Sequence, residues 1–121
     1  MEIDFENFIN LRLPGGFVLT DVTEIAEVMI DPVGRPAVAK TIIEGREIWI
    51  ILSAGMSDLE QSISIYHEVL EGLTVAMDRP PRSVENFLEH DFEAAAASAH
   101  AQFGFATAEK VVNFLQMFGF Q

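Results

Sequence analysis

The spacing of apolar residues divides this chain into two parts. Residues 24–30, 36–43 and 46–52 are short runs rich in Val and Ile, and Asp, Pro and Gly lie in the connections between them. Runs bounded in this way predict β-strands, and short connections favour antiparallel hairpins. We therefore expect a small antiparallel three-stranded sheet over about residues 24–52. Because the run 46–52 is apolar on both sides, we expect it to lie against helices.

In the second part, apolar residues recur at intervals of three or four, which is the period of an α-helix. The first such stripe follows Ser57, whose side chain is suited to cap a helix, and it runs to about Asp78, before two prolines. His67 and Glu71 fall beside the stripe, so we expect both side chains at the edge of the buried face. The stripe consists of Leu59, Ile63, Tyr66, Leu70, Leu73 and Met77.

Two further helical segments follow. Ser83 is placed to cap an Ala-rich segment that reaches Phe103, and Thr107 is placed to cap a last helix that Gly119 ends. The small side chains of the Ala-rich segment allow another helix to approach closely. Together with the strands, these segments predict one α+β domain over residues 1–121, in which the sheet packs against three to four helices.

Composition narrows the classes of function. The chain has 121 residues, which suits one domain, and half of them are apolar. A formal net charge of −12, with only seven basic residues, argues against nucleic acid or an anionic membrane as partner, because clustered Lys and Arg bind both. The lack of cysteine excludes disulfides and thiolate metal ligands. With no signal segment and no apolar run of roughly 18 residues, we expect a cytoplasmic protein.

One motif is suited to bond-breaking chemistry: His67-Glu68-x-x-Glu71. Positions i and i+4 of a helix share a face, so His67 and Glu71 can converge on one metal ion. In the H-E-x-x-H motif of zinc hydrolases both ligands are imidazoles and the intervening Glu activates the metal-bound water, a role that falls here to Glu68. Carboxylates bind zinc and harder divalent ions alike. We expect zinc or another divalent metal, and a slower hydrolytic centre than the histidine version.

Three consecutive segments carry a family resemblance. Residues 47–52 form a predicted strand, a short connection leads from it into the helix that bears His67, and Phe92-Glu93-Ala94-Ala95-Ala96 follows on a later helix. Over roughly residues 46–121 the chain resembles zincin-like minimal metallopeptidases of the ImmA/IrrE type. A zincin-like fold and a metal-dependent peptidase activity are what this resemblance implies.

The resemblance also implies a role for each matching residue. His67 and Glu71 would be metal ligands, and Glu93 would be the third ligand. Glu68 would be the general base. Glu71 departs from the family, which has a second histidine at this position. His100, seven residues after Glu93 on the same helix face, is a candidate to supply the missing imidazole; the simpler interpretation is a polar residue on the partly exposed side of an Ala-rich helix.

Two hypotheses about function follow. In the first, the protein is a metal-dependent hydrolase of peptide or amide bonds. In the second, it is a metal-free, zincin-derived protein that has no cofactor and acts as an interaction or regulatory module. The Phe-rich C-terminus, with Phe114, Phe118 and Phe120, predicts a homodimer or a protein partner if these rings are exposed.

Overall fold

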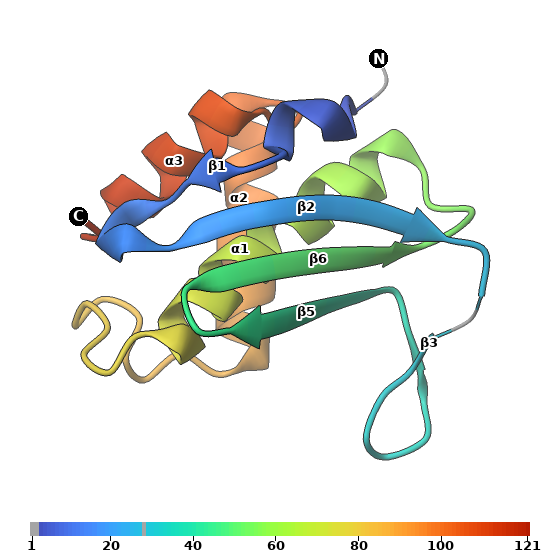
Figure 1. Cartoon of the computed structure of the whole chain (residues 1–121), viewed down its shortest axis with the longest axis horizontal. Helices are drawn as coiled ribbons and strands as arrows, with labels where there is room; N and C mark the ends of the chain where they lie inside the picture. The colour runs from blue at the N-terminus through green and yellow to red at the C-terminus, as the bar shows by residue number, and fades with distance from the viewer. Residues whose placement is uncertain (1–2, 28) are drawn as a thin grey trace.

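The computed structural model describes residues 3–27 and 29–121; residue 28, within the predicted strand 24–30, lies outside the described residues. Its main element is a four-stranded sheet in the order β1-β2-β6-β5 (Figure 1). β2 and β6 are parallel, whereas β1–β2 and β5–β6 are antiparallel. The strands are β1 (Leu11–Arg12), β2 (Val18–Ile25), β5 (Ala39–Glu44) and β6 (Glu47–Ser53). Two short 3-10 helices, η1 (Phe5–Phe8) and η2 (Pro14–Gly16), flank β1.

The α+β class is confirmed, and antiparallel pairs form at both predicted hairpins, β3 (Met29–Ile30) with β4 (Pro36–Ala37) and β5 with β6. The predicted three-stranded antiparallel sheet is nevertheless wrong, because the sheet has four strands and its β2–β6 pair is parallel. The predicted strand 24–30 is divided: its first residues end β2, and its last residues form β3, which pairs with β4 outside the sheet. β2 begins at Val18, which pairs with Arg12 of β1 and Glu47 of β6, and its register with β6 shifts between Leu19 and Asp21. Leu19 and Val22 are buried whereas Thr23 is exposed, so polar residues interrupt the apolar run that would have marked the strand.

Three helices lie on one side of the sheet (Figure 1). α1 packs against β5 and β6, and α2 and α3 pack against α1. The predicted N-caps are confirmed at two of them: the side chain of Ser57 accepts a hydrogen bond from Glu60, and that of Thr107 accepts one from Lys110. Gly119, with φ of 96°, follows the last helix as predicted. The helices are α1 (Asp58–Ala76), α2 (Glu89–Phe103) and α3 (Ala108–Met117).

The start of α2 differs from the prediction. Ser83 does not cap it, because its hydroxyl donates to the main-chain oxygen of Phe118 and the chain at 82–86 forms turns. The helix begins only after Leu88. Glu89 therefore occupies the first position of α2, at the end of the helix nearest to α1's motif.

The core fills the space between the sheet and the helices. In β6, Ile48, Ile50 and Leu52 are fully buried, whereas Trp49 and Ile51 lie half-buried on the opposite face. The expectation that this strand lies against helices is thus confirmed for one of its faces. The remaining fully buried large side chains are Phe8, Leu19, Val22, Ile65, Tyr66, Leu70, Leu73, Leu115 and Phe120.

The C-terminal phenylalanines belong mostly to this core. Phe114 and Phe120 are buried. Phe118 is half-buried, and its ring packs edge-on against those of Phe87 and Phe114, with centroids 5.9 and 5.3 Å apart. The three C-terminal rings therefore do not form the exposed surface that the dimer prediction requires. None of the helices in the described part of the chain is long and apolar enough to cross a membrane.

Candidate metal centre

Helix α1 presents the His-Glu-x-x-Glu motif at the edge of the core. Val69 and Leu70, inside the motif, are fully buried and hold the helix against the other elements. The side chains of His67 and Glu71 are 15% and 33% exposed. Their predicted place at the edge of the buried face is therefore confirmed.

At this edge one imidazole meets two carboxylates. Nε2 of His67 lies 2.9 Å from Oε2 of Glu71 and 3.0 Å from Oε1 of Glu89, which comes from the first turn of α2. The ligand atoms of these three residues all lie within 4.8 Å of one another; we call the three residues the His67 cluster. The buried ring of Phe92 lies parallel to the imidazole, with centroids 6.4 Å apart and an interplanar angle of 7°.

The spacing of the His67 cluster is close to that of a metal site. A tetrahedral ion with ligands at about 2.0–2.1 Å holds its ligand atoms roughly 3.3 Å apart. The two contacts of His67, at 2.9 and 3.0 Å, fall short of this separation by only roughly 0.3–0.4 Å, so a small side-chain movement admits an ion. One imidazole and two carboxylates also leave a fourth position for water, which is what a catalytic zinc site requires.

Glu68 lies beside the His67 cluster, and a hydrogen bond from a residue of the sheet holds its side chain in place. Its Oε2 atom is 3.9 Å from Nε2 of His67, and its side chain is 14% exposed. Thr41, on the edge strand β5, donates a hydrogen bond from Oγ1 to Oε1 of Glu68 at 2.9 Å. If the His67 cluster held an ion, this carboxylate would be placed to act as a general base toward a water on that ion.

The charges of the His67 cluster perturb one another. Burial by itself would lower the pKa of His67, but the hydrogen bond to Glu71 and the neighbouring carboxylates outweigh burial and raise this pKa. The hydrogen bond to His67 holds the pKa of Glu71 below its ordinary value. Burial raises the pKa of Glu89, and its contact with Glu71 raises it further. Burial also raises the pKa of Glu68. Because metal ligands must be deprotonated, protons and a metal ion compete for this cluster.

The His67 cluster opens into a cavity of about 760 Å³ between α1, α2 and the β3–β4 hairpin. The hairpin leads into the start of β5 and projects away from the four-stranded sheet (Figure 1). The tip of the hairpin is internally braced: the carboxylate of Asp31 accepts main-chain hydrogen bonds from Val33 and Arg35, and it pairs with Nε of Arg35 at 3.0 Å. The main-chain bond from Arg35 lowers the pKa of Asp31. The cavity lining comprises Asp31, Pro32, Arg35, Ala37, Val38, Ala39, Ser64, His67, Glu68, Glu71, Glu89 and Glu93.

The two remaining predicted ligands lie elsewhere. Glu93 is exposed and lines the same cavity, one turn of α2 beyond Glu89, but it is not among the three residues whose ligand atoms converge. His100 lies a further two turns along, and its Nδ1 atom is hydrogen-bonded to Oγ of Ser62 at 2.8 Å. The same Ser62 oxygen accepts from the main-chain N–H of Ala106. His100 thus joins α2 to buried Ser62 and does not line the cavity.

Glu89 is the residue that sequence reasoning missed. The sequence favours Glu93, because small residues follow it, as they follow the third ligand in the family that the chain resembles. A signal for Glu89 was present: it precedes Glu93 by four residues, so the two carboxylates share one face of the helix. The choice between them depends on where α2 crosses α1.

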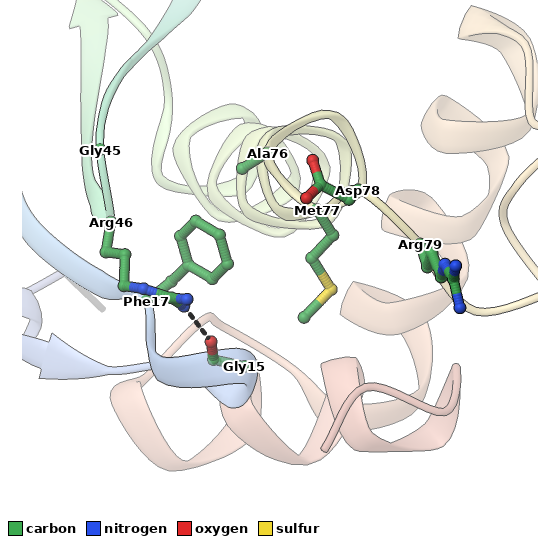
Figure 2. A pocket seen from close by; sticks show the side chains of 8 residues that line it. All are labelled: Gly15, Phe17, Gly45, Arg46, Ala76, Met77, Asp78 and Arg79. Atoms are coloured by element: carbon green, nitrogen blue, oxygen red, sulfur yellow. Dashed lines mark hydrogen bonds between the residues drawn. The ribbon is translucent and has the colours of Figure 1, made fainter.

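A second cavity, of about 440 Å³, lies near the C-terminal end of α1 (Figure 2). There Nη1 of Arg46 donates to the main-chain oxygen of Gly15 at 2.7 Å, and the guanidinium lies 5.3 Å from the centroid of the Phe17 ring. Its lining residues include no imidazole, and their single carboxylate is that of Asp78. They offer no set of ligands or nucleophile and base comparable to the His67 cluster. The lining comprises Gly15, Phe17, Gly45, Arg46, Ala76, Met77, Asp78 and Arg79.

Comparison of the chain with family models, with curated proteins and with solved structures found no match. Among the described residues, the His67 cluster is the one group of at least three His or carboxylate side chains with converging ligand atoms.

Proposed function

We propose that this protein is a zincin-like, metal-dependent hydrolase of peptide or amide bonds. One divalent ion is bound by His67, Glu71 and Glu89. Glu68 is the general base. The observation that supports this proposal is the convergence of an imidazole and two carboxylates from two helices on one point, with a further carboxylate held 3.9 Å from the imidazole nitrogen.

Each residue of the site has a distinct task in this mechanism. The ion supplies a Lewis acid that lowers the pKa of a bound water and polarises the scissile carbonyl. The ring of Phe92 lies parallel to the imidazole of His67. In the metal-free protein the hydrogen bond between Nε2 of His67 and Oε2 of Glu71 holds the two ligand side chains together, and an ion on Nε2 would replace this bond. Glu68 would take a proton from the attacking water and return it to the leaving amine.

Two carboxylate ligands affect which ion is bound and how fast the reaction runs. Their negative charge reduces the Lewis acidity of the ion relative to a site with two imidazoles, so the reaction is expected to be slower. Oxygen-rich sites also accept Mn²⁺ more readily than histidine-rich sites do. We therefore expect activity with Zn²⁺ or Mn²⁺ at a low turnover.

The alternative function is that of a metal-free interaction module. It is favoured by the pairing within the His67 cluster, because a protonated His67 partly offsets the charge of Glu71 and Glu89 when no ion is present. Exposed apolar side chains on the β3–β4 hairpin and the residue that follows it also favour this alternative: Ile30, Val33 and Val38 are 61%, 71% and 59% exposed.

Metal analysis separates the two functions. The protein is purified without chelator and its Zn²⁺ and Mn²⁺ contents are measured, followed by titration with each ion. Under the hydrolase proposal, one ion binds per chain and His67→Ala abolishes binding. His90→Ala is the matched control, because His90 is 75% exposed on α2 and lies outside the cavity lining. A folded protein that binds neither ion contradicts the proposal.

Activity is tested separately with a library of quenched fluorescent peptides. The metal-loaded protein should cleave a subset of them, and Glu68→Gln should abolish cleavage while leaving the ion bound. Loss of the ion in Glu68→Gln would contradict the role of Glu68 as base, since it would then be a ligand.

A further inference from the structure

Thr41 lies at a close approach between the sheet and α1. It faces Gly72, which is buried: a Cβ atom at position 72 would lie only 2.9 Å from Cγ2 of Thr41. Gly72 follows Glu68 by one helical turn, on the same face. The absence of a side chain at position 72 therefore allows β5 to approach α1 at the level of Glu68.

This contact directs the hydroxyl group of Thr41. Because Thr is branched at Cβ, a methyl group placed against Gly72 determines where Oγ1 points. Oγ1 donates to Oε1 of Glu68 at 2.9 Å. The position of Thr41 along β5 is set by its pairing with Ile50 of β6, which is fully buried. The pairing of β5 with β6 thus sets where the hydroxyl group of Thr41 lies.

Glu68 is close enough to the His67 cluster to become a ligand itself. Its Oε2 atom, 3.9 Å from Nε2 of His67, lies only roughly 0.6 Å beyond the separation of about 3.3 Å between ligands of a tetrahedral ion. A small rotation of the side chain closes this gap. Glu68 would then fill the position that a catalytic site leaves open for water, and it would no longer serve as the base.

We propose that Thr41 is a positioning residue that holds Glu68 outside the coordination shell and so keeps one position of the metal open to water. This inference rests on the proposed metal centre. Gly72 contributes to this positioning, because any larger residue there displaces Thr41 from Glu68. Thr41 acts through Glu68 and does not touch the ion.

The test uses the full chain with Mn²⁺ as the probe and needs no knowledge of the substrate. Thr41→Val keeps the shape of the side chain and removes the donor; Thr41→Ser keeps the donor. The Mn²⁺ affinity is measured from the electron paramagnetic resonance of the free ion, and the number of waters on the bound ion from water-proton relaxation. We expect Thr41→Val to bind Mn²⁺ about tenfold more tightly and to lose one bound water, because a further carboxylate reaches the ion. Thr41→Ser keeps the donor but lacks the methyl group that directs it, so its affinity should fall between those of the wild type and Thr41→Val.

Two further variants identify Glu68 as the cause. Glu68→Gln in the Thr41→Val background should remove the tenfold gain. Gly72→Ala should reproduce the effect of Thr41→Val from the opposite side of the contact. Circular dichroism and thermal melts establish that each variant is folded.

The outcomes separate this inference from the proposed function. If the wild type binds Mn²⁺ but Thr41→Val changes neither the affinity nor the number of bound waters, the positioning role is overturned and the metal centre stands. If the folded wild type binds neither Mn²⁺ nor Zn²⁺, both are overturned.

Discussion

Glu89 and Glu93 lie one turn apart on the same face of α2, and the proposed metal centre assigns them different tasks. Oε1 of Glu89 is 3.0 Å from Nε2 of His67, whereas Glu93 is exposed at the cavity wall. Replacement of each by Gln keeps the size of the side chain and removes its charge. The pair of variants therefore tests which carboxylate binds the ion.

The expected magnitudes differ widely. Glu89→Gln removes one of two anionic ligands and should weaken Zn²⁺ binding by about 100-fold, or about 2.7 kcal/mol, which is the upper end of the range for residues that support a metal site. Glu93→Gln removes an exposed charge that water and salt screen, and it should weaken binding by less than about fivefold. The loss in Glu93→Gln should also shrink at high salt, and that in Glu89→Gln much less.

The affinity is measured by competition for Zn²⁺ against a chromophoric chelator at a fixed pH. Thermal melts of the metal-free variants serve as the control, because Glu89 also interacts with the N-terminus of α2, a contribution of about 0.3–1 kcal/mol. If Glu93→Gln weakens binding more than Glu89→Gln does, the assignment of Glu89 as the third ligand is refuted.

Three further predictions concern pairing and burial. The folded-state pKa of His67 is raised above 6.5, so the pairing of His67 contributes stability that is complete below about pH 6.5 and is lost as the pH rises through the raised pKa. In urea unfolding without metal, His67→Gln should therefore lower the unfolding free energy more at about pH 6 than at about pH 9. Ser62→Ala leaves the buried N–H of Ala106 and the Nδ1 atom of His100 without their partner, and should cost about 1–3 kcal/mol in urea unfolding with no change in Zn²⁺ affinity. Tyr66→Phe removes a hydroxyl that donates to a main-chain oxygen at 3.1 Å, and it should lower the unfolding free energy by about 1 kcal/mol. Burial raises the pKa of Tyr66 to about 12, so the ultraviolet absorbance of the folded wild type should show no tyrosinate at about pH 10.

The sheet shows where prediction from sequence reached its limit. The antiparallel pairing of β5 and β6 follows from the short turn between them, and it was predicted. The parallel pairing of β2 and β6 was not, because it joins segments separated by the hairpin and by β5. Thr23 is polar and faces outward, so the pattern of apolar residues around it did not mark β2 as a strand.

The candidate site likewise has a part that was predictable from the sequence and a part that was not. The relation of His67 to Glu71 was predictable, because both lie on one helix and the spacing of four residues places them together. The contribution of Glu89 depends on the late start of α2 after the turns at 82–86. The hydrogen bond from Thr41 to Glu68 depends on the absence of a side chain at Gly72.

The sequence by itself determined the α+β class, helix α1 and the place of its motif at the edge of the core. These features arise from contacts within one or two helical turns, which the spacing of residues specifies. Only the tertiary structure decided that Glu89 rather than Glu93 meets His67, that His100 turns to Ser62, and that β5 holds Glu68. Distances between separate elements depend on how the whole core packs, and no local pattern encodes them.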